Sequence, residues 1–249
     1  MDQEQKTITL IGTGHVFDLK DALQEIFSQK NPNVLCVELD RQRYHSIILK
    51  KQDPKRYKES SKNLPFLYRI LAQFQENMAE RFGVVPGDEM ITTIEYAQLY
   101  QIPLVCIDMH AQKLFSRMIR SMSFREKFTF LISGIAGLFV KSETVEKQVQ
   151  DISTNVDSYL TEIGKRFPTI KKILIDERNE YMVKNIEKLT ETYENLVAIV
   201  GDGHIPGMTK ILKEKGFEID TIRLHDLQRM PKKEKDKGSA SFHVEYQGF

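Results

Sequence analysis

The chain has 249 residues, of which 41% are hydrophobic and 29% are charged, fractions that are ordinary for a globular protein and exclude wholesale disorder. Its 36 basic and 35 acidic residues leave a net charge of +1, so no global field draws it to nucleic acid, which we exclude as a partner. The length suits one large domain, or one domain that carries a sizeable insertion.

The chain shows no signal for secretion or for crossing a membrane. Its first residues lack the basic region and apolar stretch of a signal peptide. No apolar run reaches the roughly 20 residues that span a bilayer, and the nearest, 128–140, predicts a buried helix. Cys36 and Cys106 lie inside apolar runs, typical of small buried side chains in a reducing compartment. We expect a cytoplasmic protein that reaches a membrane only through a partner.

Short runs rich in Val, Ile and Leu predict strands that are covered on both faces, as in a parallel sheet. They occupy residues 7–12, 33–39, 103–109, 196–202 and, with a weaker pattern, 217–224. Helical patterns lie between them at 18–30, 40–51, 65–82, 88–101 and 206–216. Asp18 and Asp40 are the expected N-caps of the first two helices. The predicted fold class is α/β, with a central, mainly parallel sheet flanked by helices.

A long segment without strand signals separates the third and fourth strands. It predicts helices at about 111–121, 124–140, 143–165 and 168–191. We interpret 111–191 as a helical insertion within a single domain of residues 1–229, and its role as a lid or as a homodimer contact stays open. Residues 230–249 predict a charged linker followed by a short strand.

Polar residues follow the ends of four predicted strands, where open parallel sheets bind their ligands. Two matching turns, Gly12-Thr13-Gly14-His15 and Gly201-Asp202-Gly203-His204, each follow a buried strand. Glu38 ends the second strand, and Asp108 ends the third, with His110 two residues later. Glycines at such turns permit tight bends and let a ligand approach the backbone. The sequence therefore predicts one active or binding site at this edge.

Two imidazoles and a carboxylate suit a divalent metal, and equally a general acid/base pair. Asp108 and Asp202 are candidates for additional ligands, or for groups that orient an imidazole. Plainer readings stay open: Glu38 forms a structural ion pair with Arg41 or Arg178, and Asp108 caps the following helix.

Four blocks of the sequence resemble the TraB/PrgY, or pheromone-shutdown, family. The blocks are GTGHVFDLKDALQEIFSQKNPNVLCVELDRQRY (12–44), PGDEMITTIEYAQ (86–98), LIDERNEYMVKNI (174–186) and VAIVGDGHIPGM (197–208). They are similar to the family's GxxH and ELD arrangement, its G-x-E-M helix start, its ERD-x-YM helix and its VVGxGHxxGI turn. The resemblance implies a fold shared with Tiki, ChaN-like and erythromycin-esterase-like proteins.

Tiki proteins are divalent-metal-dependent proteases that use two GxxH motifs and a glutamate. The resemblance therefore implies a metal, such as manganese, cobalt or zinc, held by His15, Glu38 and His204. Glu89 and Arg178 match further motif positions, and we expect Glu89 to be the catalytic base and Arg178 to meet an oxyanion or a substrate carboxylate. Glu177 is a further catalytic candidate, which pairs with Arg178 or faces the site. The expected substrate contacts are Arg41 and the glycines Gly12, Gly14, Gly201 and Gly203.

One departure from the family pattern changes the expected site. The family usually reads Asp-Arg-Asp after the third strand, whereas this sequence reads Asp108-Met109-His110. A contact to an anionic group is thereby lost, and His110 becomes a candidate third imidazole.

The leading hypothesis is a metal-dependent hydrolase that acts on peptides. The alternative is a non-catalytic, regulatory protein of the pheromone-shutdown type that binds peptides. A third hypothesis is a scaffold that dimerises through the helical insertion.

Overall fold

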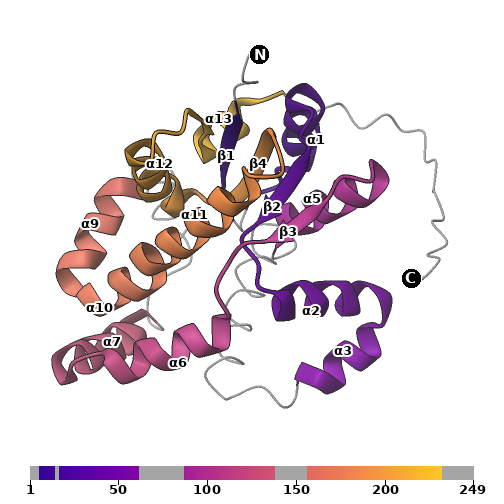
Figure 1. Ribbon diagram of the computed structural model, residues 1–249. Coiled ribbons are helices and arrows are strands. Elements are labelled where there is room, and N and C mark those ends of the chain that lie inside the picture. The colour runs from indigo at the N-terminus through magenta and orange to yellow at the C-terminus, as the bar shows by residue number, and fades with distance from the viewer. Residues whose placement is uncertain (1–5, 15–16, 62–86, 138–155, 232–249) are drawn as a thin grey trace.

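The computed structural model describes residues 6–14, 17–61, 87–137 and 156–231 (Figure 1). At its centre is a five-stranded sheet with the order β3-β2-β4-β1-β5, in which every neighbouring pair is parallel. This confirms the predicted α/β class, and the five strands predicted between residues 7 and 224 are found. The strands are β1 (Thr7–Thr13), β2 (Val34–Val37), β3 (Leu104–Cys106), β4 (Asn195–Gly201) and β5 (Ile219–Ile222).

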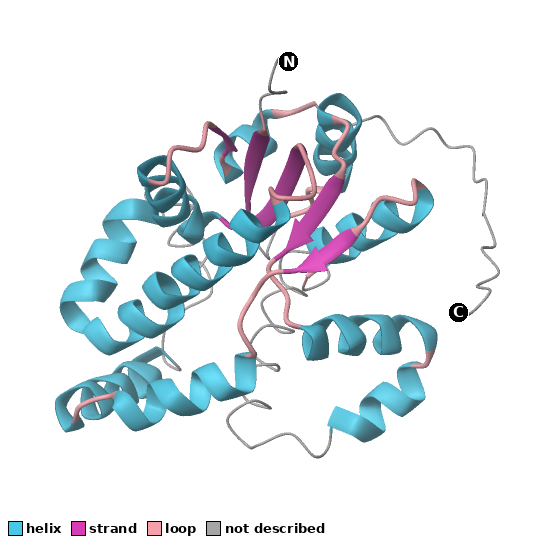
Figure 2. Cartoon of the chain, viewed as in Figure 1, coloured by secondary structure: helices cyan, strands magenta, loops and turns pink. Residues whose placement is uncertain are grey.

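Helices cover both faces of the sheet (Figure 2). One face packs against α1 (Lys20–Lys30), α5 (Asp88–Leu99) and α13 (Leu224–Arg229), and the other packs against α11 (Glu177–Leu189) and α12 (Ile205–Glu214). Side chains alternate along each strand, so Ile11 faces the first layer and Leu10 the second. The two cysteines lie on neighbouring strands as free thiols, with Cys36 buried and Cys106 half-buried.

The described part of the segment between β3 and β4 (107–137 and 156–194) contains helices and no strand, as the sequence predicts, and its last helix, α11, packs on the sheet itself. It contains α6 (Ala111–Ser121), α7 (Phe124–Gly137), α9 (Val156–Arg166), α10 (Pro168–Lys171) and a π-helical turn, η1 (Lys172–Asp176), before α11. The insertion has a small core of its own, formed by Leu114, Met118, Met122 and Ile173.

Glu126 joins two helices of the insertion. Its carboxylate accepts hydrogen bonds from the backbone and hydroxyl of Ser123, and the backbone N–H of Glu126 donates back to that hydroxyl. This is a capping box at the start of α7. The same carboxylate accepts the backbone and hydroxyl of Thr169, in α10, at 2.8 and 2.9 Å. These donors lower the pKa of Glu126 although its burial raises it.

The sequence patterns missed several local features. Two further helices lie outside the predicted ones, namely α3 (Pro54–Ser61), which follows α2 (Arg41–Gln52), and α13. Leu19, not Asp18, occupies the N-cap of α1, because Leu19 is buried in the core and fixes where the helix starts. The expected helix 65–82 and the expected C-terminal strand fall outside the described residues.

Within the described parts of the chain, none of the helices combines the length and the apolar character needed to cross a bilayer.

Candidate functional site

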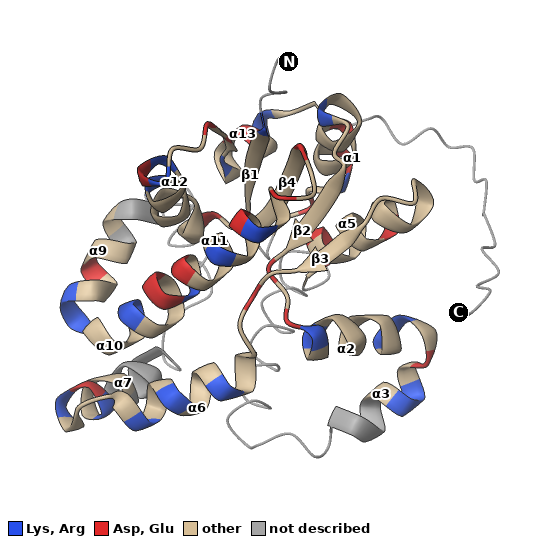
Figure 3. Cartoon of the chain, in the orientation of Figure 1, with Lys and Arg blue, Asp and Glu red and all other residues tan. Residues whose placement is uncertain are grey.

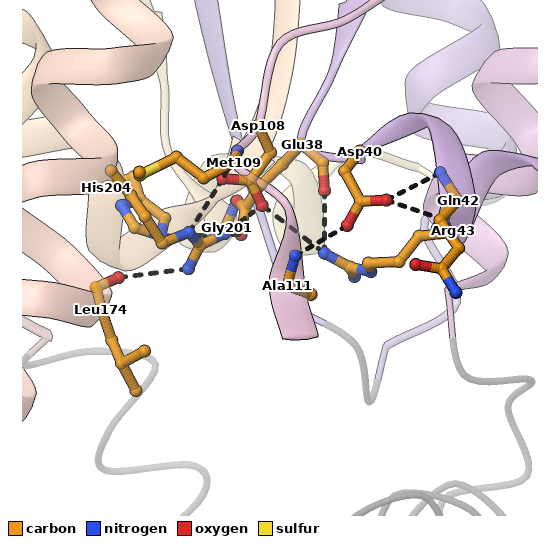
Figure 4. Close-up of polar contacts among 11 residues, drawn as sticks. Glu38, Asp40, Gln42, Arg43, Asp108, Met109, Ala111, Leu174, Gly201 and His204 are labelled. Atoms are coloured by element: carbon orange, nitrogen blue, oxygen red, sulfur yellow. Dashed lines mark hydrogen bonds and ion pairs between the residues drawn. The ribbon is translucent and has the colours of Figure 1, made fainter. Parts of the chain in front are cut away.

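The strand order brings the predicted polar residues to one edge of the sheet. β2 lies between β3 and β4, and parallel strands end at the same edge. Glu38 follows β2, Asp108 lies two residues beyond β3, and the 3-10 turn η2 (Asp202–His204) follows β4. Glu38, Asp108 and His204 consequently meet in space (Figure 4), although up to 166 positions separate them in the chain.

Arg178, in the first turn of α11, holds the two carboxylates together. Its Nε and Nη2 donate to the two oxygens of Asp108 at 2.9 and 2.8 Å, and Nη2 also donates to Glu38 Oε1. Nη1 donates to the Leu174 carbonyl, within the π-helical turn, at 3.2 Å. The side chain of Arg178 is 13% exposed, against 9% for Glu38 and 2% for Asp108. The ion pair between Glu38 and Arg178, one of the open readings, is therefore present.

The second oxygen of Glu38 is bound to the turn after β4. The backbone N–H of Gly201 donates to Oε2 at 2.5 Å, and a Cβ on residue 201 would lie 3.3 Å from that oxygen. Burial raises the pKa of Glu38, but the charge that His204 acquires in acid, the Arg178 guanidinium and the Gly201 N–H together hold it well below its usual range. Glu38 is thus a carboxylate throughout the physiological pH range.

His204 is buried and oriented by Asn179. Its Nδ1 lies 2.6 Å from Asn179 Oδ1, and an amide oxygen only accepts, so Nδ1 carries the proton. Burial lowers the pKa of His204, which outweighs the opposing charge of Glu38, and the ring is neutral near pH 7. Nε2 therefore presents a lone pair, and it lies 3.5 Å from Glu38 Oε1.

Asn179 was not among the predicted site residues. Its close approach to His204 depends on Gly207, because a Cβ on residue 207 would overlap the Asn179 amide nitrogen. The signal was available in the family's ERD-x-YM motif, where Asn179 stands at the position of the Asp.

Arg43 and Asp40, also absent from the predicted site, complete its other side. Arg43 Nη1 donates to the Glu38 carbonyl at 3.2 Å and lies 3.6 Å from Asp108 Oδ2. Asp40 Oδ1 caps α2 by accepting two backbone N–H groups, as predicted, and its Oδ2 accepts the backbone N–H of Ala111, at the start of α6, at 2.9 Å. One carboxylate thus caps two helices. Asp108 leaves that role to Asp40 and instead accepts the backbone N–H of Met109 at 2.7 Å.

Asp202 belongs to a separate contact. It accepts Arg223 Nε and Nη2 at 2.9 and 2.8 Å, and the backbone N–H of Leu224 at 2.9 Å. Gly12 leaves room for this carboxylate, because a Cβ there would overlap Asp202 Oδ1. These contacts join β1, β4 and α13. They explain why residue 12 is a glycine by packing alone.

The other predicted residues lie at the starts of helices or in turns. Glu177 pairs with Arg117 of α6 instead of the expected Arg178, which bonds Asp108 and Glu38. Arg41 and His110 are exposed at the starts of α2 and α6. Glu89 is 2% exposed in the first turn of α5, the helix that leads into β3 and so begins near the same edge. Of the remaining turn glycines, Gly14 follows β1, where a Cβ would contact Leu224 and Phe17, and Gly203 lies in η2.

The described residues include only part of the expected metal site. Among them, no three His, Cys, Asp or Glu side chains are grouped so as to hold a metal. His204 and Glu38 are two of the three expected ligands, and the third, His15, lies outside the described residues.

These features define an α/β protein whose parallel sheet carries a buried arginine–carboxylate–histidine network at its carboxyl edge. The family model of the TraB/PrgY/gumN family matches residues 1–221, and the chain belongs to that family, as the sequence blocks indicated. It is similar to "Uncharacterized protein MJ1365" of Methanocaldococcus jannaschii, with 34% identity over 234 residues that cover 90% of this chain and 58% of the relative. The chain therefore spans less than two thirds of that relative.

Proposed function

We propose that this protein is a divalent-metal-dependent hydrolase acting on peptides, with the metal held by Glu38, His204 and His15. One observation carries the metal part: the unprotonated Nε2 of a neutral His204 faces the ionised Glu38 at 3.5 Å. Two electron-rich groups turned toward each other in a buried place are stabilised by a cation between them. Imidazole and carboxylate are common ligands of zinc and of other transition metals, including manganese and cobalt.

Asn179 supports this proposal. Histidines that bind metals usually donate their other ring N–H to a nearby oxygen, which fixes the tautomer and the ring orientation. The contact between His204 Nδ1 and Asn179 Oδ1 has that form. It keeps the lone pair on the nitrogen that faces Glu38.

In this proposal, a bound metal supplies Lewis acidity, which makes water a nucleophile near neutral pH. Arg178 and the Gly201 N–H fix the orientation of Glu38. Arg178 uses four of its five N–H groups on Asp108, Glu38 and Leu174, which leaves one for a developing oxyanion. Glu89 is the proposed general base, and the choice of peptides as substrates rests on the family resemblance alone.

A second candidate function is peptide binding without catalysis. Both Glu38 oxygens already accept hydrogen bonds, Oε1 from Arg178 and Oε2 from Gly201. A carboxylate so fully engaged also serves as a structural anchor, with the surrounding edge free to recognise a peptide.

The deciding experiment measures metal content and cleavage on the same protein. Purified protein is loaded with manganese, cobalt or zinc, dialysed, and analysed for bound metal, and the loaded protein is then incubated with a peptide library. We compare His204→Ala and the His15→Ala/His204→Ala double variant with the wild type. His225→Ala is the matched control, because His225 lies on α13 with its side chain 45% exposed.

Stoichiometric metal in the wild type and in His225→Ala, but not in the other two variants, together with peptide cleavage, is the expected result. Stoichiometric metal without cleavage of any peptide would refute the hydrolase. Peptide binding by protein free of metal would establish the second candidate.

A further inference from the structure

The start of α7 presents an aromatic face to solvent. Phe124 is 91% exposed and Phe128, one turn later, is 65% exposed. Residues four apart lie on the same side of a helix, so the two rings form one surface. The opposite side of α7 carries the buried Glu126 and faces α10.

Exposed cations flank this aromatic face on α7, and others lie on the preceding helix. Arg125 and Lys127 are exposed on either side of it, and Lys127 Nζ lies 5.8 Å from the centre of the Phe124 ring. On α6, Lys113 and Arg120 are exposed as well. Figure 3 shows the Lys and Arg residues spaced along α6.

The local charge differs from that of the whole chain. Residues 111–137 contain five Lys or Arg and one acid, whereas the chain as a whole has a net charge of +1. The one acid, Glu126, is buried in the capping box, and Arg117 is paired with Glu177 of α11. Residues 111–137 therefore present four exposed cations and no exposed acid to solvent. A partner for this surface must be negatively charged and must accept two exposed aromatic rings.

We propose that Phe124, Phe128, Arg125 and Lys127, here called the α7 face, dock directly onto an anionic lipid bilayer. Aromatic rings favour the interface between headgroups and acyl chains, and each nearby cation is attracted to the anionic lipids. The α7 face lies flat on the surface and spans nothing. This contact requires no partner protein, in contrast to the sequence expectation.

Other occupants fit these observations less well. A second copy related by a two-fold axis would bring the same cationic surface against itself. Nucleic acid matches the charge and can stack on aromatic rings, but the net charge of +1 gives the chain no extended field for a polyanion. An acidic protein would need a pocket for each ring, whereas a bilayer takes up both without one. The proposal is independent of the metal site, because no residue of the α7 face belongs to the Glu38 network.

Flotation with vesicles tests this proposal. The full chain is mixed with vesicles of phosphatidylcholine alone, or of phosphatidylcholine with phosphatidylglycerol, at low and at high salt. We expect flotation with the anionic vesicles only, weakened at high salt. Neutralising Arg125 and Lys127 to Gln should weaken binding roughly fivefold for each cation removed, and Phe124→Ser/Phe128→Ser should weaken it roughly tenfold or more.

Matched controls lie on other helices. Leu99→Ser/Tyr100→Ser removes two exposed apolar side chains at the end of α5, and Lys210→Gln/Lys213→Gln removes two exposed cations from α12. Neither pair should change flotation, and circular dichroism checks that every variant is folded. Absence of flotation with anionic vesicles would overturn the proposal, as would flotation that survives loss of both phenylalanines. A dimer that disappears in Phe124→Ser/Phe128→Ser, without vesicle binding, would assign the face to a second copy.

Discussion

Replacing Arg178 with Met removes the only cation that bonds both Glu38 and Asp108 through their side chains among the described residues. Met has a similar length and keeps much of the packing, so the main effect is electrostatic. The two carboxylates, 9% and 2% exposed, would then lie close together without their common partner. We expect the free energy of unfolding to fall by about 3–5 kcal/mol, the usual cost of breaking a buried ion pair by removing one partner.

Urea unfolding and thermal unfolding both measure this change. For a chain of this size, the expected loss corresponds to a decrease of about 6–20 °C in Tm. The dependence on urea concentration should stay the same, since the surface exposed on unfolding is unchanged. The triple variant Glu38→Gln/Asp108→Asn/Arg178→Met removes the charges together and should regain roughly half or more of the loss.

The control is Lys215→Met, which breaks the ion pair between Lys215 and Glu187 on the surface. Both side chains are 40% exposed, so this variant should lose less than about 1 kcal/mol. If Arg178→Met lost no more than that control, the reasoning would be wrong, because the carboxylates would then be accommodated without their arginine. The same conclusion would follow if the triple variant were less stable than the single one.

Three further predictions concern other contacts. Glu126→Gln should lower the free energy of unfolding by about 1–3 kcal/mol at pH 7, because its amide nitrogen cannot accept the backbone and hydroxyl donors that bind the carboxylate. Since the folded pKa of Glu126 is lowered, its stabilisation is present above the pKa of glutamate in the unfolded chain and is lost as pH falls through the lowered value. The urea midpoints of variant and wild type should therefore converge in acid. Asp40→Asn should keep the cap of α2 but remove the acceptor for α6, and Asp40→Ala should remove both. The free energy of unfolding in urea should fall by about 1 kcal/mol in the first variant and about 2 kcal/mol in the second. Equal decreases would contradict the shared cap. Gly207→Ala should lower the free energy of unfolding by about 1–3 kcal/mol through overlap with Asn179. The double variant Gly207→Ala/Asn179→Ala should be more stable than Gly207→Ala alone. If it is not, the overlap is relieved by movement of other groups.

The sheet was predictable because its signals are local. Each strand is a short apolar run bounded by turn residues, and the structure confirms all of them. The order of the strands was not predictable, because a run such as Val34–Val37 carries no information about which neighbour it pairs with. The π-helical turn at Lys172–Asp176 was missed for a related reason, since the helical pattern runs through it without a break.

The location of the candidate site was predictable from the sequence, but most of its individual contacts were not. Strand ends pointed to Glu38, Asp108 and His204, and the structure brings these three together. Asp202 has the same kind of position but binds Arg223 instead. The sequence spacing does not distinguish the two aspartates, because the ion-pair partner of each is the arginine that the tertiary fold places next to it.

The arrangement of the sheet also bears on how the chain folds. β4 pairs with both β1 and β2, so Thr7 lies opposite Asn195 and Val34 opposite Leu196. During synthesis, the first two strands therefore emerge long before the strand that separates them. Contacts so distant in the sequence form slowly, and the apolar edges of β1 and β2 stay open to wrong partners in the meantime. A chain interrupted before residue 195 would lose the centre of its sheet, and with it the turn that carries His204.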